Sequence, residues 1–559
     1  MDVHRINDRL SVGPQITLAD VLDLEKAGFR SVIVNRPDGE APDQPTHEEM
    51  RVAAEAAGMK LQYLPVTPGM VSDETAAEFD QTLNELPGPV FAYCRTGTRS
   101  ATLWSLAEAA KRPLPEILAA TKAAGYDMNG VARRIANGGK TPTDTGDAKF
   151  DIVIVGAGAG GIAVAAGLKS RKPSLDIALI DPADIHYYQP GWTMVGGGIF
   201  DAKTTAKTMG SLIPKGVHWI KAAVAAFEPK DSAIILDGCR VVKYERLVVC
   251  PGLKLDWDGI EGLEETLGRN GVTSNYRYDL APYTWQLVQE MKSGRALFTQ
   301  PAMPIKCAGA PQKAMYLSGD AWFRRGVLKN IDIQFMNAGG VLFGVKDYVP
   351  ALMKYVEKYD ATLNFFYNLV SVDGPAKKAT FKVAKPDTDP TEVTVEFDMM
   401  HVCPPQVAPD FIRVSPLADA AGWVDVDQAT LRHKTFDNIW SLGDVMNAPN
   451  AKTAAAARKQ APTVAENVVA DIRGRSAIAQ YDGYGSCPLT VERGKIVLAE
   501  FGYGGALKPS FPAWMIDGTQ PSRAAWLLKE KILPPIYWQA MLKGKEWMAK
   551  PEQLKVAAE

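Results

Sequence analysis

The sequence predicts an α/β protein with more than one domain. Its 559 residues are enough for about three or four domains, and the hydrophobic (46%) and charged (23%) fractions are ordinary for a globular protein. Short strands rich in Ile and Val alternate with helix-compatible stretches along the chain. One of these strands, within residues 149–155, runs directly into the glycine pattern GAGAGG at residues 156–161. A strand, a glycine turn and a helix in this order begin a parallel βαβ unit.

Composition and charge exclude several kinds of partner. With a net charge of −2 and no block of Lys or Arg, the chain is not expected to bind nucleic acid. The N-terminus lacks the apolar segment of a signal peptide and no apolar run is long enough to span a membrane, so we expect a cytoplasmic protein. Six cysteines and six histidines are too scattered for a disulfide framework or a metal site.

Residues 1–137 are predicted to form a small α/β domain that contains a cysteine loop. The strand at 89–93 runs into the segment CRTGTRS at residues 94–100. The loop amides and the N-terminus of the next helix favour a thiolate at Cys94 and bind an oxyanion. Arg99 can add a bidentate contact to that anion. The other elements that we expect here are strands at 31–34 and 61–66 and helices at 46–58, from 72 (Ser72 as N-cap) and at 101–111.

This segment resembles the cysteine loop of the tyrosine-phosphatase and rhodanese superfamilies, and most closely the small phosphatase-like domain of sulfur-handling hydrolases. The resemblance covers most of the domain, including NRPDG at 35–39. Tyrosine phosphatases place one more residue between Cys and Arg than the four that separate Cys94 from Arg99, a spacing that rhodanese-like loops share. The smaller loop suits a persulfide or a small sulfur anion, so we expect a sulfurtransferase. A phosphatase with Asp38 or Asp73 as general acid and a non-catalytic binding module remain open alternatives.

The glycine pattern predicts an adenine-dinucleotide site. Gly156, Gly158 and Gly161 have the spacing of a tight turn, a close approach of backbone to pyrophosphate and close helix–strand packing. The helix N-terminus then faces the pyrophosphate. A second strand at 175–180 ends at Asp181, about 20 residues on, where an acid holds a ribose hydroxyl. A stretch rich in Gly, Thr and Asp just before this unit, at 138–148, reads as a linker.

Two later segments indicate that the expected dinucleotide is FAD. They are RLVVCPGL at 246–253 and NIWSLGD at 438–444, the second followed by a helix at 454–460. In flavoproteins with two dinucleotide domains, an aspartate placed like Asp444 after Gly443 holds the ribityl chain, and the next helix points at the flavin.

A second glycine fingerprint, which would bind NAD(P)H, is missing. The strand at 296–300 is followed by a segment that contains Cys307 in place of such a loop. We therefore expect an electron donor other than NAD(P)H, and thiol chemistry in its place.

Four segments resemble the sulfide:quinone oxidoreductases, and most closely their mitochondrial-type branch. They are HYYQPGWT at 186–193, KCAGAPQK at 306–313, AAGWVD at 420–425 and YDGYGSCP at 481–488. The resemblance covers about residues 149–549. It implies two Rossmann-like domains, with an oxidoreductase core at 149–509, followed by a membrane-associating region at 510–559.

The resemblance also implies the chemistry. Cys307 and Cys487 would form a redox pair on one face of FAD, with Cys307 nearer the flavin. Sulfide attacks the bridged cysteines, one becomes a persulfide, and the other delivers two electrons to the flavin as a sulfur anion. The sulfur leaves to a small acceptor (a thiol or sulfite), and quinone takes the electrons. Lys306 and Lys313 flank Cys307, and the simpler interpretation is that they are solvated.

The other cysteines are interpreted mainly as packing residues. Cys250 lies in a glycine-turn strand, where a small buried side chain suffices, although a role in sulfur relay remains open. Cys239 and Cys403 are interpreted as structural.

Residues 510–559 are the membrane candidate. Two short amphipathic helices broken by Pro534 and Pro535 carry Trp and Tyr beside Lys, as interfacial anchors do. The alternative is a pair of helices packed on the core or at a dimer interface, so a homo-oligomer also remains open. We expect a peripheral protein on the inner face of the membrane.

The sequence thus predicts an FAD-dependent sulfide:quinone oxidoreductase fused to a sulfurtransferase. Sulfur made at Cys307 and Cys487 could pass to Cys94, directly or through a small thiol. The alternatives are an NAD(P)H:quinone dehydrogenase of the same fold, a sulfide or redox sensor, and an independent phosphatase in the first domain.

Overall fold

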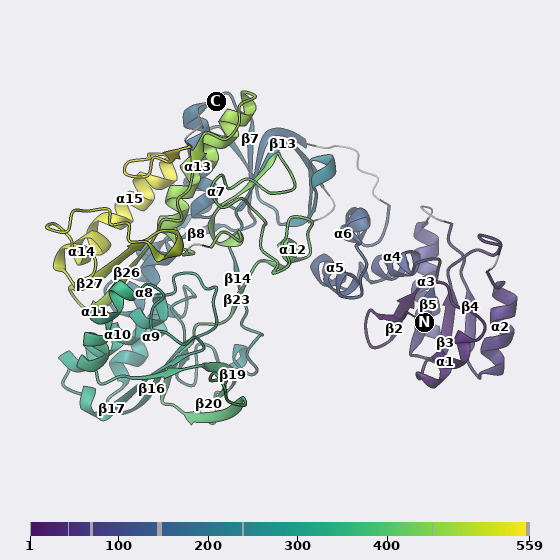
Figure 1. Cartoon of the computed structure of the whole chain (residues 1–559), viewed down its shortest axis with the longest axis horizontal. Helices are drawn as coiled ribbons and strands as arrows, with labels where there is room; N and C mark the ends of the chain where they lie inside the picture. Colours follow the sequence, from purple (N-terminus) through teal and green to yellow (C-terminus); the bar gives the residue numbers. More distant parts are fainter. Residues whose placement is uncertain are drawn as a thin grey trace. The chain divides into compact units, whose positions relative to one another are not determined.

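The computed structural model describes residues 2–42, 44–67, 71–141, 148–237, 240–449 and 451–554 (Figure 1). Most of the predicted linker (142–147) and Cys239 lie outside these residues. The chain divides into two compact units. One comprises residues 1–150, 222–244 and 410–418, and the other comprises 151–221, 245–409 and 419–559.

The N-terminal residues of the first unit form a five-stranded sheet of order β1-β2-β5-β3-β4. Four strands are parallel and β1 pairs antiparallel with β2. The strands are β1 (His4–Arg5), β2 (Leu10–Gly13), β3 (Ser31–Val34), β4 (Lys60–Tyr63) and β5 (Val90–Tyr93). The helices are α1 (Asp20–Lys26), α2 (His47–Ala56), α3 (Asp73–Glu85), α4 (Thr98–Glu108), α5 (Leu114–Ala123) and α6 (Ala132–Ala136).

The helix after the cysteine loop begins three residues earlier than the sequence predicted. Gly97 is its N-cap with a φ of +90°, so the chain turns into α4 at Thr98 rather than at Ala101. Arg99 consequently belongs to the first turn of the helix and not to the loop. The predicted N-cap of α3 is confirmed, because the Ser72 hydroxyl accepts a hydrogen bond from the Thr75 amide.

The second unit contains two sheets of parallel strands. The first contains β10, β7, β6 and β13 in this order, with β24 beside β13, as part of a seven-stranded sheet, and every residue of the inner strand β7 is buried. The strands are β6 (Ala148–Val155), β7 (Ile177–Ile180), β10 (Val217–Ile220), β13 (Val241–Val249) and β24 (Ile439–Ser441). The main helices on this sheet are α7 (Ala159–Arg171) and α13 (Ala454–Ile472).

The second sheet has the order β15-β22-β16-β17-β18, again parallel throughout. The strands are β15 (Val272–Thr273), β22 (Met399–His401), β16 (Gly294–Gln300), β17 (Ile331–Asn337) and β18 (Thr362–Phe365), and the helices are α9 (Ala281–Glu290), α10 (Ala310–Arg324) and α11 (Val349–Lys358). The prediction of an α/β fold with two Rossmann-like domains is confirmed. A hairpin of β26 (Gly485–Glu492) and β27 (Lys495–Phe501) follows in the chain.

The C-terminal helices are continuous rather than separated by prolines. α14 (Arg523–Leu527), the π-helix η11 (Leu528–Ile532) and α15 (Leu533–Gln539) follow one another directly. Pro534 and Pro535 lie in the first turn of α15, directly after the π-helix η11. Within the described residues, no helix combines the length and the apolar character that crossing a bilayer requires.

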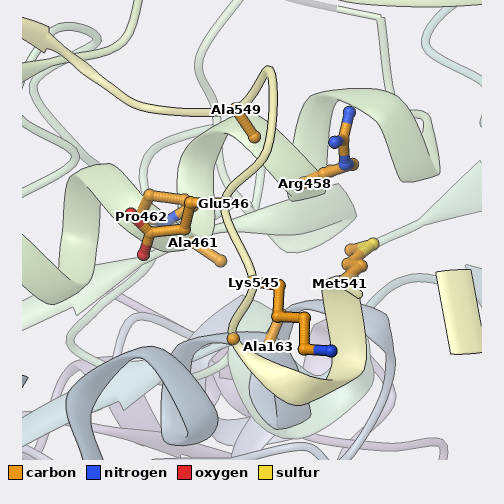
Figure 2. A pocket seen from close by; sticks show the side chains of 9 residues that line it. Ala163, Arg458, Ala461, Pro462, Met541, Lys545, Glu546 and Ala549 are labelled. Atoms are coloured by element: carbon orange, nitrogen blue, oxygen red, sulfur yellow. The ribbon is translucent and has the colours of Figure 1, made fainter. Parts of the chain in front are cut away.

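The end of the chain packs against α7 and α13. Glu546 forms an ion pair with Arg171 of α7, with 2.6 Å between Oε1 and Nη1. Figure 2 shows Met541, Lys545 and Glu546 beside residues of α7 and α13. The cavity that remains between them is about 10 Å³, which is room for one water at most.

Candidate active site

Two cysteines that lie 180 positions apart in the sequence meet in the second unit. Cys307 lies in the loop between β16 and α10 with a φ of +50°, and Cys487 lies on β26. Their Sγ atoms are 3.5 Å apart, within hydrogen-bond range for sulfur and beyond the roughly 2.05 Å of a disulfide bond. The two cysteines are therefore not bonded to each other, and a small movement would bring them to bonding distance.

A buried lysine favours the thiolate of one cysteine. Lys313, in the first turns of α10, is only 2% exposed, and its Nζ donates to Cys307 Sγ at 3.0 Å. The hydrogen bond from Cys487 holds the pKa of Cys307 well below its usual range; burial opposes this shift and the charge of Lys313 adds to it. The same hydrogen bond, with burial, raises the pKa of Cys487. Cys307 is therefore the thiolate and Cys487 the thiol, and Lys313 is not the solvated residue of the simpler interpretation.

Two more lysines lie near this pair. Lys529 of η11 is buried and donates to the carbonyl oxygen of Pro190 at 2.9 Å. Burial lowers its pKa to about 8, and the charge of Lys313 adds to this. Lys306 donates to Gln189 Oε1 at 2.6 Å, and burial lowers its pKa. The thiolate thus lies in positively charged surroundings that sequence reasoning noticed only in part.

The glycine turn requires glycine at two of the three predicted positions. Gly156 has a φ of +98°, and a Cβ there would lie 2.5 Å from the Cys250 carbonyl oxygen. A Cβ on Gly161 would lie 1.8 Å from the Gly156 oxygen. Gly158, the N-cap of α7, has open space around it, which leaves the helix N-terminus accessible. Asp181 orders the turn, because its Oδ2 accepts from the Ala157 amide at 2.7 Å.

The Gly443-Asp444 segment is tied to the cysteine loop. Lys452 donates from Nζ to the carbonyl oxygens of Asp444 (2.7 Å) and Met446 (2.9 Å). The Lys452 carbonyl accepts from the Cys307 amide at 2.9 Å. Gly443 has a φ of +81°, and burial raises the pKa of Asp444 against the charge of Lys452. One lysine therefore links the segment predicted to hold the cofactor to the reactive thiol.

A cavity of about 640 Å³ joins these features, a volume typical of a cofactor site. Gly158, Asp181, Asp444 and Cys307 line it. Asn275 lines it as well, and both polar atoms of its amide are buried without a hydrogen-bond partner in the described part of the chain. A ligand with polar edges is needed to satisfy that amide, so the residues present fit a dinucleotide cofactor. No sequence motif pointed to Asn275.

The C-terminal helix reaches the same region. The Nε2 atom of His186 forms a hydrogen bond with the Tyr537 hydroxyl at 2.6 Å. Its Nδ1 atom lies 3.1 Å from the Ala157 carbonyl oxygen, within hydrogen-bond distance. Burial lowers the pKa of His186. Tyr537 and Trp538 are buried, so these two aromatic residues are not free to contact a membrane. These two residues fit the alternative to membrane contact, in which the C-terminal helices pack on the protein core.

Other apolar residues of the C-terminal part are exposed. Trp514 is 82% exposed and Trp547 is 63% exposed. Ile532 and Trp547 also line the 640 Å³ cavity. The C-terminal part therefore contributes exposed apolar side chains to the lining of the cavity.

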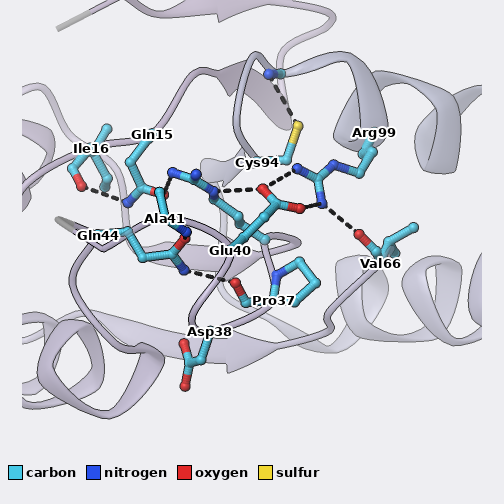
Figure 3. Close-up of polar contacts among 12 residues, drawn as sticks. Gln15, Ile16, Pro37, Asp38, Glu40, Ala41, Gln44, Val66, Cys94 and Arg99 are labelled. Carbon is cyan, nitrogen blue, oxygen red and sulfur yellow. Dashed lines mark hydrogen bonds and ion pairs between the residues drawn. The ribbon is translucent and has the colours of Figure 1, made fainter. Parts of the chain in front are cut away.

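In the first unit, one amide of the cysteine loop contacts the thiol. Cys94 is completely buried, and its Sγ accepts from the Gly97 amide at 3.2 Å. Arg99 makes a bidentate contact, but to Glu40: Nη1 donates to Oε1 at 2.9 Å and Nη2 to Oε2 at 2.8 Å (Figure 3). Arg99 Nη1 also donates to the Val66 carbonyl at 2.6 Å. Sequence reasoning missed Glu40, since its partner is 59 residues away.

The two candidate general acids are engaged elsewhere. Asp73 accepts from Arg134 Nη2 at 2.8 Å and from the Thr141 amide. Asp38 accepts from the His47 amide at 2.8 Å. Both act as turn or helix-start residues, the simpler of the two interpretations.

The remaining described cysteines are packing residues. Cys250 fills the space beneath the glycine turn, with its Sγ 3.5 Å from the Gly156 oxygen, and burial raises the pKa of the thiol. Cys403 follows β22, and burial raises its pKa to about 12. Neither is a ready nucleophile at neutral pH.

A cavity lined by a dinucleotide-binding turn and by Cys307, one member of a close thiol pair, is the arrangement of a flavin-dependent oxidoreductase. The sequence model of the pyridine nucleotide-disulphide oxidoreductase family matches residues 150–287. The mitochondrial sulfide:quinone oxidoreductase of Dictyostelium discoideum is 42% identical over 402 residues, which are 71% of this chain and 87% of that protein. The chain belongs to the sulfide:quinone oxidoreductase family, and it is an FAD-dependent enzyme.

Two further comparisons concern the fold and the first unit. The sulfide:quinone oxidoreductase structure from Aquifex aeolicus shares the fold, with a TM-score of 0.58 and 18% identity over 73% of this chain and 98% of that one. The model for the phosphatase-like domain of the beta-lactamase hydrolase-like protein matches residues 2–111. The Agrobacterium fabrum protein of that name is 43% identical over 109 residues, 20% of this chain and 25% of its own length.

Proposed function

We propose that the chain oxidises sulfide at Cys307 and Cys487, delivers the electrons to quinone through FAD, and releases the sulfur to a thiol or sulfite. The observation that carries this proposal is the 3.5 Å sulfur–sulfur contact, with Lys313 at 3.0 Å, beside the cavity that the glycine turn lines. The alternative with NAD(P)H as donor has no comparable support, because the loop after β16 carries Cys307 in place of a glycine fingerprint.

The residues for the cofactor are those of the two glycine segments. Gly156, Gly158 and Gly161 would receive the pyrophosphate at the N-terminus of α7, and Asp181 the ribose. Gly443 and Asp444 would hold the ribityl chain. FAD, when bound, supplies a two-electron acceptor beside Cys307.

The asymmetry of the thiols assigns their roles. In the oxidised pair, sulfide forms a bond to one sulfur and the Cys307–Cys487 bond breaks. The thiol of lower pKa leaves faster, and Lys313 holds Cys307 as the leaving thiolate. Sulfide therefore attacks Cys487, which becomes the persulfide, while Cys307 keeps the electron pair that goes on to the cofactor. Transfer of the outer persulfide sulfur to a thiol or sulfite leaves the Cys487 thiolate, and this sulfur would bond to Cys307 again once the bound cofactor has accepted the electron pair of Cys307.

Anaerobic titration with sulfide tests this proposal. We expect sulfide to bleach the flavin absorbance of the wild type, and Cys307→Ala to abolish bleaching. Cys94→Ala is the matched control, because Cys94 lies in the first unit and its replacement should leave bleaching intact. A wild-type flavin that sulfide does not reduce would reject the proposal.

For the first unit we propose sulfur transfer at Cys94, with sulfur delivered from Cys487 directly or through a small thiol. The support is a buried thiol that accepts from a loop amide, together with an arginine in the following helix that pairs with Glu40 and a loop of only four residues between Cys94 and Arg99. This arrangement suits a persulfide better than a phosphoryl group. Cys94→Ser should keep sulfide-dependent quinone reduction and lose sulfur transfer; unchanged transfer to all acceptors would exclude a role for Cys94.

We also propose that the exposed apolar residues of the C-terminal part contact a membrane, from which quinone enters the cavity. Trp514 and Trp547 support this, because large exposed aromatic residues favour the membrane interface.

A further inference from the structure

A lysine lies on the buried face of the C-terminal helices α14, η11 and α15 (Figure 1). The buried residues Ala525, Trp526 and Lys529 are three and four positions apart, so that they share one helix face. Lys529 is only 3% exposed. It belongs to the π-helix η11, and π turns are frequent at functional sites. A lysine buried on an otherwise apolar face needs a partner for its charge.

The chain itself gives Lys529 no negatively charged partner. In the described ranges, no carboxylate forms an ion pair with its ammonium group. The neighbouring Glu530 accepts from Trp526 Nε1 at 2.8 Å and pairs with Lys531 at 3.0 Å. The Lys529 ammonium donates to the carbonyl oxygen of Pro190 at 2.9 Å. An ammonium group has three N–H donors, and a carbonyl carries no net charge, so both donors and charge are left for a ligand.

Lys529 lines the same cavity as the reactive thiolate. Lys529, Pro190, Lys313 and Cys307 all contribute to the lining of this 640 Å³ space. Burial lowers the pKa of Lys529, and the sulfurs of Cys307 and Cys487 act in the opposite direction, because they lie close enough to interact with its charge. Lys313 is already hydrogen-bonded to the Cys307 thiolate. Two ammonium groups and one thiolate therefore leave one positive charge that nothing compensates.

We propose that Lys529 binds the small sulfur anions that react at Cys487, which are hydrosulfide as sulfur donor and sulfite as acceptor. Hydrosulfide forms a bond to the Cys487 sulfur while the Cys307–Cys487 bond breaks. Sulfite then forms a bond to the outer persulfide sulfur while the bond of that sulfur to Cys487 breaks, which yields thiosulfate, the Cys487 thiolate and a proton that passes to water.

One cation beside the thiol pair can serve both steps, because both nucleophiles approach Cys487. A full negative charge also gains more from an uncompensated ammonium group than a neutral quinone does. The inference rests on the proposed function and names the residue that binds the sulfur substrates of that function.

The test compares Lys529→Met with the wild type as full-length holoenzymes. Two values should rise by about tenfold or more, the effect of one hydrogen bond to a charged group. They are the sulfide concentration that half-saturates the rate of anaerobic flavin bleaching without acceptor, and the KM for sulfite at saturating sulfide. The KM for quinone should not change. Lys531→Met is the matched control, because Lys531 belongs to the same π-helix and is 64% exposed.

The two measurements distinguish the two anions. A rise in only one of them keeps the site and assigns it to the anion of that step. Unchanged values in both, or a rise confined to the KM for quinone, would overturn the inference. If Lys529→Met folds poorly, Lys529→Gln removes the charge, can still donate to the Pro190 carbonyl oxygen and should give the same result.

Protection of Cys307 by thiocyanate, an unreactive sulfur anion, tests the site without turnover. Thiocyanate should slow the alkylation of Cys307 by iodoacetamide, followed by mass spectrometry, and Lys529→Met should need about tenfold more of it than Lys531→Met. Such protection in a protein whose flavin sulfide does not reduce rejects the proposed function and keeps the anion site. Flavin reduction by sulfide with equal protection in the two variants rejects the role of Lys529 alone.

Discussion

At the scale of single residues, the chemistry depends on which thiol carries the negative charge. Lys313 contacts Cys307, and the Cys487 thiol donates to the same sulfur. This arrangement concentrates the charge on Cys307 and leaves Cys487 protonated. A cysteine pair without the lysine would share the charge more evenly, and the preference for attack at one sulfur would weaken.

Replacing Lys313 by Met should raise the pKa of Cys307, because methionine keeps most of the unbranched side chain and removes the charge. A group with a depressed pKa is already ionised at low pH, so the loss of Lys313 should move the acid limb of sulfide-dependent flavin reduction to higher pH. The measurement is the pH profile of the reduction rate. Exposed Lys329 supplies the control Lys329→Met, whose profile should match the wild type; an unshifted profile in Lys313→Met would contradict the assignment.

At the scale of elements, two glycines of the dinucleotide-binding turn lie in different surroundings. Gly161 brings α7 against the turn, where a Cβ would lie 1.8 Å from a backbone oxygen, whereas Gly158 has no atom within 4 Å of an added Cβ. The same motif therefore contains one glycine that the packing requires and one that the packing does not require.

The two glycines should respond differently to alanine. Gly161→Ala should lower the free energy of unfolding by about 1–3 kcal/mol or more, as overpacking does, and lose bound flavin. Gly158→Ala should keep the thermal midpoint of the apoprotein and still bind less FAD. Denaturation of the apoproteins and flavin absorbance distinguish the two; full flavin content in Gly158→Ala would remove Gly158 from the cofactor site.

The aromatic residues of the C-terminal part differ in their exposure. Tyr537 and Trp538 are turned inward, and Trp514 and Trp547 outward. Replacing both Trp514 and Trp547 by Ser should weaken binding to lipid vesicles severalfold in a co-sedimentation assay, while Phe323→Ser, which changes an exposed aromatic residue of α10, should not. Equal binding by all three proteins would argue against membrane contact through this region.

At the scale of the whole molecule, the chain combines two cysteine sites in two different units. Replacing the cysteine of one site should therefore abolish the activity of that site and leave the activity of the other site intact. Cys307→Ala should still move sulfur at Cys94 from an added small-molecule persulfide, since that step needs no flavin. Cys94→Ser should reduce quinone with sulfide at the wild-type rate. Transfer assays with a persulfide donor and quinone reduction assays on both variants test this independence.

Much of this organisation could be predicted from the sequence, because its signals are local or belong to a recognisable family. The glycine turn needs only contiguous residues, and the pair of Cys307 and Cys487 followed from resemblance rather than from spacing. Glu40, the buried state of Lys313 and the contact of His186 with Tyr537 could not be predicted in this way. Their partners depend on the tertiary fold; His186 and Tyr537 are 351 residues apart.

Lys452 connects the backbone at Cys307 to the segment that begins at Asp444, and this connection affects how the enzyme unfolds on heating. Its carbonyl holds the backbone of Cys307, and its ammonium group holds the segment that begins at Asp444. Displacing either segment breaks contacts of the same residue, so the two should melt as one cooperative unit. Release of the flavin and exposure of the Cys307 thiol to a chromogenic reagent should then share a single midpoint temperature.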